Sequence, residues 1–301
     1  MSSPDLFSIV IAINHLSDSV KETQEIVKQV NNVDWSKDYI MPFLTLLLSA
    51  AVAYLSAKSG YKWQDKFLTN KLKIDTVNKT ILGFQNMQGT LLSLKGNYAN
   101  NLSEHPLQRT IAVPLMIYSF SPLNLNYEHL LQVIMTNDIS IKNKPWFNIS
   151  SYVSVQDQFN QLDKIIQERN SYDYKIKDGL AREYERKSFT VDEILSNVNS
   201  VDLHKYIELT EIIINMIDNL TISVNDFLRN FPETASQLIG KDKSKYYKMI
   251  QGYKNESELV KNLQKRTVPL DFELAEEILN IPSADIMRML CDQSYTIQTP
   301  K

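Results

Sequence analysis

The chain has 301 residues and a formal net charge of −3 at pH 7. Its first 38 residues hold three lysines and six acidic residues, so the rest of the chain is electrically neutral. A neutral chain lacks the basic face that general nucleic-acid binding requires, which disfavours nucleic acid as a partner. The one cysteine, Cys291, excludes an intramolecular disulfide and suits a reducing compartment. With only 7 glycines, the composition favours helix.

An apolar residue recurs every three or four positions between residues 6 and 30. This spacing is the a/d pattern of a coiled coil over about three and a half heptads. We predict a helix that self-associates; the alternative is a single amphipathic helix that lies on the membrane or on its own domain. The residues of this heptad pattern are Leu6, Ile9, Ile13, Leu16, Val20, Thr23, Val27 and Val30.

Residues 39–57 (YIMPFLTLLLSAAVAYLSA) contain no formal charge. As a helix they would extend about 28 Å, close to the hydrocarbon thickness of a bilayer. A buried core helix rarely runs this long without charge, and a signal peptide needs a basic start directly before a short apolar run. We therefore predict one membrane-spanning helix.

Aromatic and basic residues border this apolar run, where aromatic rings favour the headgroup layer. The expected membrane-interface residues are Trp35, Tyr39, Lys58, Tyr61, Lys62 and Trp63. Lysines are frequent just after the run, whereas acidic residues dominate before it. Because Lys and Arg near a span stay in the cytoplasm, we predict a single-pass protein of the inner (cytoplasmic) membrane, with its N-terminus outside and its C-terminal domain in the cytoplasm.

Small residues recur at every fourth position inside the apolar run, at Ser49, Ala53 and Ala57. Small residues on one face let two helices approach closely in lipid. Together with the preceding heptads, this spacing predicts a homo-oligomer.

The remaining apolar spacing predicts further helices. The membrane helix is expected to continue as a stalk to about residue 99, weakened by Gly83 and Gly89. Residues 111–120 are expected to form a buried helix or strand. Helices are also expected at 127–135, at 153–169 and, as two pieces broken at Pro282, at 272–290.

Two local signals bound the helices between these segments. Thr190 and Glu193 form a capping box, T-x-x-E, that predicts a helix start. A long core helix is expected over 201–231, ended by Pro232. The chain is thus mainly α, with a single transmembrane helix, an N-terminal amphipathic or coiled-coil helix and a C-terminal cytoplasmic helical bundle. The expected parts are residues 1–38, 39–58, a stalk at 59–100 and the cytoplasmic domain at 101–301.

No group of residues has the spacing of a known catalytic or ligand site. The four histidines are far apart, and none has a His, Cys or Glu at a metal-ligand spacing. A phosphate-cradling glycine loop is also missing. We therefore predict no metal, no cofactor and no catalytic residue, which favours a binding protein over an enzyme.

Arg169 and Asn170, followed by Tyr172, form the most conspicuous polar group of the soluble part. They stand at the end of a strong helix. We expect Arg169 to cap carbonyl groups or to bridge helices; the alternative is a surface for a protein partner.

Residues 273–290 (ELAEEILNIPSADIMRML) are similar to the helix-turn-helix of transcription regulators. The segment has one extra residue before the turn, and Asn280 stands where that motif favours glycine. Because no basic residues surround it, a helical hairpin packed on the bundle is the preferred interpretation.

Together these patterns predict a membrane-anchored helical protein that acts by self-assembly and protein–protein interaction, as a sensor or scaffold with an unidentified cytoplasmic protein partner. The alternative is a membrane-perturbing effector of a toxin-like or phage-defence system, triggered through its cytoplasmic domain. Thr45, Ser49 and Ser56 are the polar groups that would line such an opening.

Overall fold

The computed structural model describes residues 4–28, 35–118, 120–121, 123–135, 146–183, 190–239, 248–250 and 257–291. Within these ranges the chain is mainly helical and contains no strand, so the prediction of a mainly α fold is confirmed. The chain divides into two compact units, Met1–Thr69 and Asn70–Lys301.

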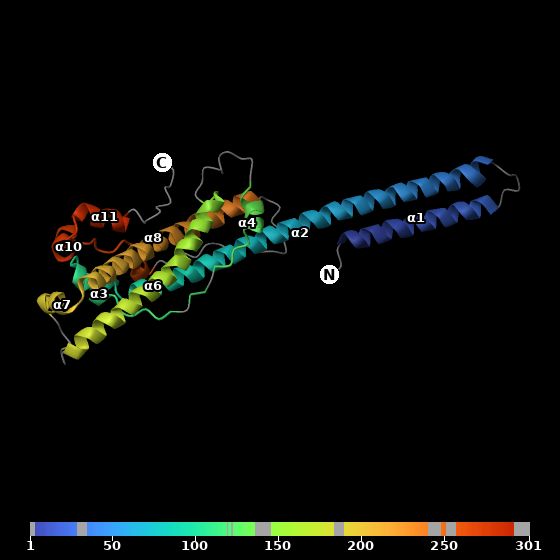
Figure 1. Ribbon diagram of the computed structural model, residues 1–301. Coiled ribbons are helices and arrows are strands. Elements are labelled where there is room, and N and C mark those ends of the chain that lie inside the picture. Colours follow the sequence, from blue (N-terminus) through green and yellow to red (C-terminus); the bar gives the residue numbers. More distant parts are fainter. Residues whose placement is uncertain are drawn as a thin grey trace. The chain divides into compact units, whose positions relative to one another are not determined.

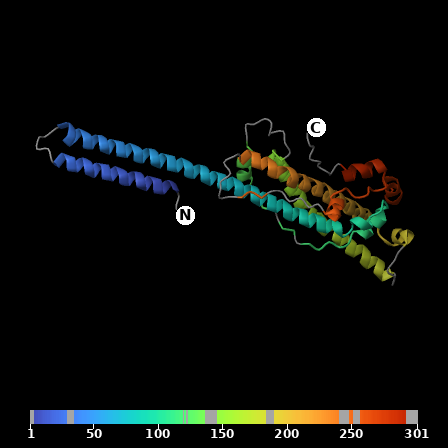
Figure 2. The same ribbon diagram turned by 180° about the vertical axis from the view of Figure 1, so that it is seen from behind.

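The first unit contains α1 (Pro4–Lys28), the single π-helical turn η1 (Ser36–Ile40) and the beginning of α2 (Met41–Gly96). Both views show α1 running beside the beginning of α2 (Figures 1 and 2). The predicted N-terminal helix and the predicted helix over 39–57 are both present. Pro42 follows η1 directly: Met41 N still donates to Ser36 O in a wider π turn, whereas Pro42 has no N–H to continue the series.

α2 is one continuous helix of 56 residues. From Ile74 onward one apolar face of the helix is buried, with Val77, Ile81 and Phe84 at helical spacing. This part of the predicted stalk is therefore a core helix of the second unit.

Gly83 has a packing role in α2. A Cβ at this position would lie 2.4 Å from Leu123 Cδ1, so the glycine allows a close approach of the chain after α3. Gly89 has open space around it. Both glycines are accommodated without breaking the helix, because the buried face of α2 stabilises it.

The core of the second unit is formed by α2, α6 (Ile149–Glu183) and α8 (Ser200–Ile239), which lie together in Figures 1 and 2. An aromatic cluster joins the three helices, and the rings of Phe84 and Phe227 stack at 3.8 Å between centroids. The other rings of this cluster are Trp146, Tyr152 and Phe231. Such ring pairs add to the free energy of apolar burial.

The prediction that Pro232 ends the core helix is wrong, because α8 continues through it to Ile239. Proline removes one backbone donor from the helix. Here the following turns are held by tertiary packing, since Ala235 and Ile239 are buried in the core. Burial of an apolar face outweighs the lost hydrogen bond.

Short helices surround this core, several at the predicted places. They are η2 (Ala99–Asn101), α3 (Pro106–Ala112), α4 (Tyr127–Ile134), α7 (Val191–Asn197), α9 (Glu258–Leu263), α10 (Phe272–Leu279) and α11 (Ser283–Cys291). The predicted capping box is confirmed: Thr190 Oγ1 accepts from Glu193 N, and the Glu193 carboxylate accepts from Thr190 N. A buried helix or strand was expected over residues 111–120. The described residues of this range that follow α3 form no regular structure.

α10 and α11 form the expected hairpin. Asn280 ends α10 in the left-handed conformation, with φ of 53°, which Asn tolerates better than most residues. Asn280 therefore adopts the left-handed backbone conformation, and this is the position at which the helix-turn-helix motif favours glycine. The buried side chains Ala275, Leu279 and Ile286 belong to an apolar cluster with α8, so the hairpin is packed on the bundle.

Candidate functional site: an apolar helix surface and a buried ionic cluster

Among the described residues, one helix is long and apolar enough to cross a membrane. Its most apolar window has a mean hydropathy of 1.9 and no buried residue. Leucines point outward from it, and Leu48 is 64% exposed. A contiguous apolar surface of this kind is unusual in a monomeric soluble protein and marks a membrane or protein contact.

The predicted interface residues are exposed beside this surface. Trp35 and Tyr39 pack their rings together, with centroids 5.8 Å apart. At the other end Lys58 Nζ lies 5.8 Å from the centroid of the Tyr54 ring, a cation–π contact. Tyr61 and Trp63 are exposed, as is Lys62.

Two hydroxyl groups of the apolar segment bond to their own helix. Thr45 Oγ1 donates to Met41 O at 2.6 Å, and Ser49 Oγ donates to Leu46 O at 2.8 Å. These donors are therefore satisfied without water, which lowers the cost of placing them in an apolar medium. Ala53 and Ala57 follow at helical spacing and are exposed.

Part of the predicted heptad pattern faces α2. A groove in the first unit is lined on one side by Leu16, Val20 and Thr23 of α1, and on the other by α2 residues that include Thr45 and Ser49. Ile13 is exposed. The side chains of Leu6, Ile9 and Val27, and the whole of Val30, lie outside the described residues. Three heptad residues thus lie next to this chain's own helix.

Arg169 is fully buried, and its guanidinium is held by the end of α3. It donates to Thr110 O at 2.8 Å and Val113 O at 2.6 Å, and also to Pro114 O. Thr110 lies in the last turn of α3 and Val113 and Pro114 follow it, where the helix itself offers no backbone donor. Arg169 therefore caps α3 from α6, and its side chain has no exposed surface.

A tyrosine and a carboxylate of the same cluster complete this junction. The Arg169 guanidinium lies 4.8 Å from the centroid of the Tyr206 ring and 3.6 Å from Asp173 Oδ1. Tyr206 Oη donates to Asp173. Burial is the main cause of a raised pKa for Tyr206, so its hydroxyl stays protonated. The junction connects α3, α6 and α8.

Asn170 and Tyr172 are half-buried beside this junction. The Asn170 side chain donates to Met116 O at 2.8 Å and accepts from Met116 N at 3.4 Å. It thereby holds the irregular segment after α3. Tyr172 packs against the apolar cluster that includes α10.

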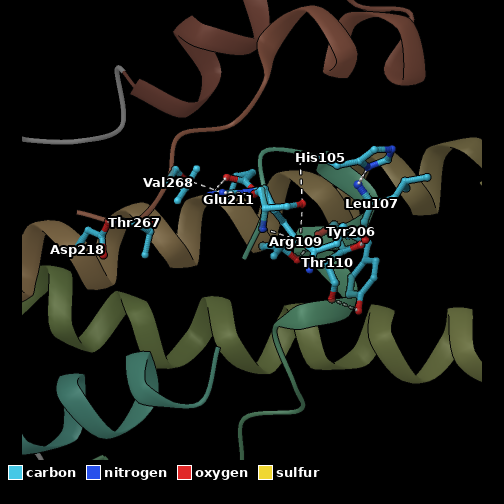
Figure 3. A network of polar contacts seen from close by, with 12 residues as sticks. His105, Leu107, Arg109, Thr110, Tyr206, Glu211, Asp218, Thr267 and Val268 are labelled. Carbon is cyan, nitrogen blue, oxygen red and sulfur yellow. Dashed lines mark hydrogen bonds and ion pairs between the residues drawn. The ribbon is translucent and has the colours of Figure 1, made fainter. Parts of the chain in front are cut away.

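A second buried ion pair joins α3 to α8 (Figure 3). Arg109 contacts both oxygens of Glu211, with Nε–Oε1 at 2.7 Å and Nη2–Oε2 at 3.0 Å. Its Nη1 donates to Ser103 O at 3.0 Å and to Val268 O at 2.7 Å. Burial raises the pKa of Glu211, while the guanidinium opposes that shift.

A third buried pair joins α2 to α8. Lys95 Nζ lies 2.6 Å from Asp218 Oδ1, and both side chains are buried. Lys95 also donates to Lys265 O, and Asp218 Oδ2 accepts from Thr267 N at 2.7 Å. The second and third pairs thus reach the same C-terminal segment, as the position of Thr267 and Val268 in Figure 3 shows.

Sequence reasoning did not identify these two pairs. Glu211 and Asp218 are seven residues apart on α8, amid the apolar residues Ile212, Ile213 and Ile217. An acidic residue on the apolar face of a helix signals a buried cation. The sequence does not show which lysine or arginine that cation is.

This cluster suits recognition of backbone groups. The cations point at peptide carbonyls, and Asp218 accepts a peptide N–H.

Within the described ranges no group of three or more His, Cys, Asp or Glu is arranged to hold a metal ion.

Comparison with known proteins adds no relative: no family model, curated protein or solved structure matches the chain.

Proposed function

We propose that this chain is a single-pass membrane protein that acts by self-assembly and by contact with a cytoplasmic protein, as a sensor or scaffold. The observation that carries the proposal is the uncharged surface of α2, whose window of span length has no buried residue. Lipid is the partner that an all-round apolar helix requires. The lysines that follow it support the proposed orientation, with the C-terminal unit in the cytoplasm at the inner membrane.

Self-assembly is proposed to use the small-residue face of α2. Ser49, Ala53 and Ala57 leave room for a second helix, and the hydroxyl of Ser49 is already satisfied. The heptad residues of α1 would add contacts next to this face.

The test is the mass of the full-length protein in detergent, compared between Ala53→Leu and Ala51→Leu. Leucine at 53 fills the small-residue face and is expected to lower the oligomer fraction. The same enlargement at position 51, about 160° around the helix, should leave the oligomer fraction unchanged. A monomeric wild-type protein, or an equal effect of both variants, would contradict assembly through this face.

A membrane-perturbing effector is the second candidate. Thr45 and Ser49 line the groove beside α1, so the polar side of the apolar segment is the one that faces another helix. Several copies arranged around these hydroxyls would form a polar lining. Induced expression would then lower the membrane potential of the cell, whereas a sensor or scaffold leaves it intact.

A further inference from the structure

Residues 264–271, here called the strap, connect α9 to α10 without regular structure. In Figure 3 the strap passes over α8 at Thr267 and Val268. Its ends are anchored by two buried leucines, Leu263 and Leu270. Between these two leucines, the strap is held by side chains of the two buried ion pairs Arg109–Glu211 and Lys95–Asp218, which belong to α2, α3 and α8.

These groups bind mainly the backbone of the strap. Lys95 Nζ donates to Lys265 O, and Arg109 Nη1 donates to Val268 O at 2.7 Å. Asp218 Oδ2 accepts from Thr267 N at 2.7 Å. At its end, Asp271 N donates to Glu104 O at 3.0 Å.

Few side chains of the strap take part. The Thr267 hydroxyl donates to Asp218 Oδ2 at 2.9 Å, and Arg266 Nη2 donates to Asn219 Oδ1 at 2.6 Å. Lys265, Val268 and Pro269 are exposed, with Val268 at 43%. The strap therefore lies on the bundle as an extended peptide lies on a receptor, with its backbone bound and most of its side chains outward.

The chemistry beneath the strap favours local opening. Four charged side chains are desolvated there, Lys95, Arg109, Glu211 and Asp218. Such burial is costly even for paired charges. When the strap lifts, water reaches these groups and restores their hydration, which offsets part of the cost of exposing Leu270 and the apolar residues of α10 and α11. A segment with these properties can open without global unfolding.

We propose that the strap is an internal ligand of a peptide-binding groove on α2, α3 and α8. Opening of the strap frees α10 and α11 and makes the groove available to an extended segment of a protein partner. The partner segment carries Thr or Ser at the place of Thr267, because Asp218 accepts both a backbone N–H and a hydroxyl there. The proposal rests on the proposed function only in that the partner is a protein, and its tests need no membrane role.

Local opening is tested by hydrogen exchange of the full-length protein in detergent. Asp218→Asn removes the charge that holds Lys95 and Thr267, and the exchange of amides in 264–291 should rise about tenfold. The amides of α6 and of the middle of α8 should stay protected. Faster exchange throughout the bundle, or no change in 264–291, would overturn the idea of a releasable strap.

The matched control is Asp226→Asn on the same helix. Asp226 Oδ2 accepts from Trp146 Nε1 at 2.8 Å, and no described contact joins it to the strap. An amide oxygen can still accept that bond, so exchange in 264–291 should stay at the wild-type rate. If this variant opens the strap as much as Asp218→Asn does, the effect is not specific to the groove, and the proposal fails.

Binding of an external peptide to the groove is tested with a labelled synthetic peptide of residues 262–272. Thr267→Val in the protein weakens the strap, and the peptide should bind this variant at least several-fold more tightly than the wild type, because more of the groove is open. Thr267→Ser keeps the hydroxyl and should behave as the wild type. A peptide with Val at position 267 should bind more weakly than the Thr peptide. Equal binding of both peptides, or no binding to Thr267→Val, would overturn the peptide site and leave the membrane proposal untouched.

Discussion

At the scale of single residues, buried charges define this protein. Arg169 makes five hydrogen bonds, three of them to carbonyls in the last turn of α3 and just after it. A guanidinium presents donors in several fixed directions, whereas an ammonium is a point charge. The position therefore requires arginine rather than positive charge alone.

Arg169→Lys is expected to lower the free energy of unfolding of the second unit by about 2–4 kcal/mol, because several carbonyls lose their donor in a buried site. Chemical denaturation measures this change. Arg229→Lys, at an exposed position of the neighbouring helix α8, should have an effect below about 0.5 kcal/mol. Equal effects of the two substitutions would contradict the capping role.

The raised pKa of Glu211 gives a pH dependence with a definite sign. In the folded state the pKa of this carboxyl is raised from its ordinary value of 4.5, mainly because the group is buried. Between the two pKa values the folded state binds more protons than the unfolded one, so stability from this group falls as pH rises.

The measurement compares the wild type with Glu211→Gln, which does not titrate at this position. Denaturation between pH 4 and about pH 7 should show the variant gaining stability relative to the wild type as pH rises. A difference that is constant across this range, or of opposite sign, would show that Arg109 outweighs burial.

At the scale of elements, the two glycines of α2 are alike in sequence but different in their surroundings. A Cβ at Gly83 would meet Leu123 at 2.4 Å, whereas Gly89 has nothing within 4 Å. Alanine favours helix at both places by up to about 1 kcal/mol. Only at Gly83 must a buried side chain move to admit it.

Gly89→Ala should therefore stabilise the protein by about 0.5–1 kcal/mol, and Gly83→Ala should be less favourable by about 1–2 kcal/mol. Thermal or chemical denaturation of the two variants under the same conditions gives this difference. If both glycines respond alike to alanine, Leu123 does not pack against α2 as described.

At the scale of the whole molecule, α2 carries two different kinds of surface along one helix. Around Leu48 the helix is mostly apolar and has no buried residue, whereas from Ile74 one face is buried in a protein core. Leu48 and Leu82 are both exposed leucines of this helix, at 64% and 48%. They permit a matched test of the membrane proposal.

Leu48→Lys should reduce the fraction of protein that remains in alkali-washed membranes, because lysine at the centre of a span costs about 2.5–3.5 kcal/mol. Leu82→Lys should leave that fraction unchanged. If both variants stay in the membrane as well as the wild type, the segment around Leu48 does not span it.

The sequence alone determined the local features of this protein. The capping box at Thr190, the break at Pro282, the apolar run and the presence of most long helices were readable, because periodicity and capping depend on neighbours within a few residues. The helix ends were not: the helix expected to end at Arg169 continues to Glu183 as α6. The apolar run is confirmed as one long exposed helix, while its place in a membrane stays a prediction.

Only the tertiary structure decided which residues are partners. Glu211 pairs with Arg109, and Asp218 with Lys95, each across more than 100 residues of chain. Burial in the core, not local preference, carries α8 past Pro232 and hides Arg169. The strap could not be predicted from the sequence either, because it is held mainly through its backbone groups. Every residue has these groups, so no sequence pattern marks such a contact.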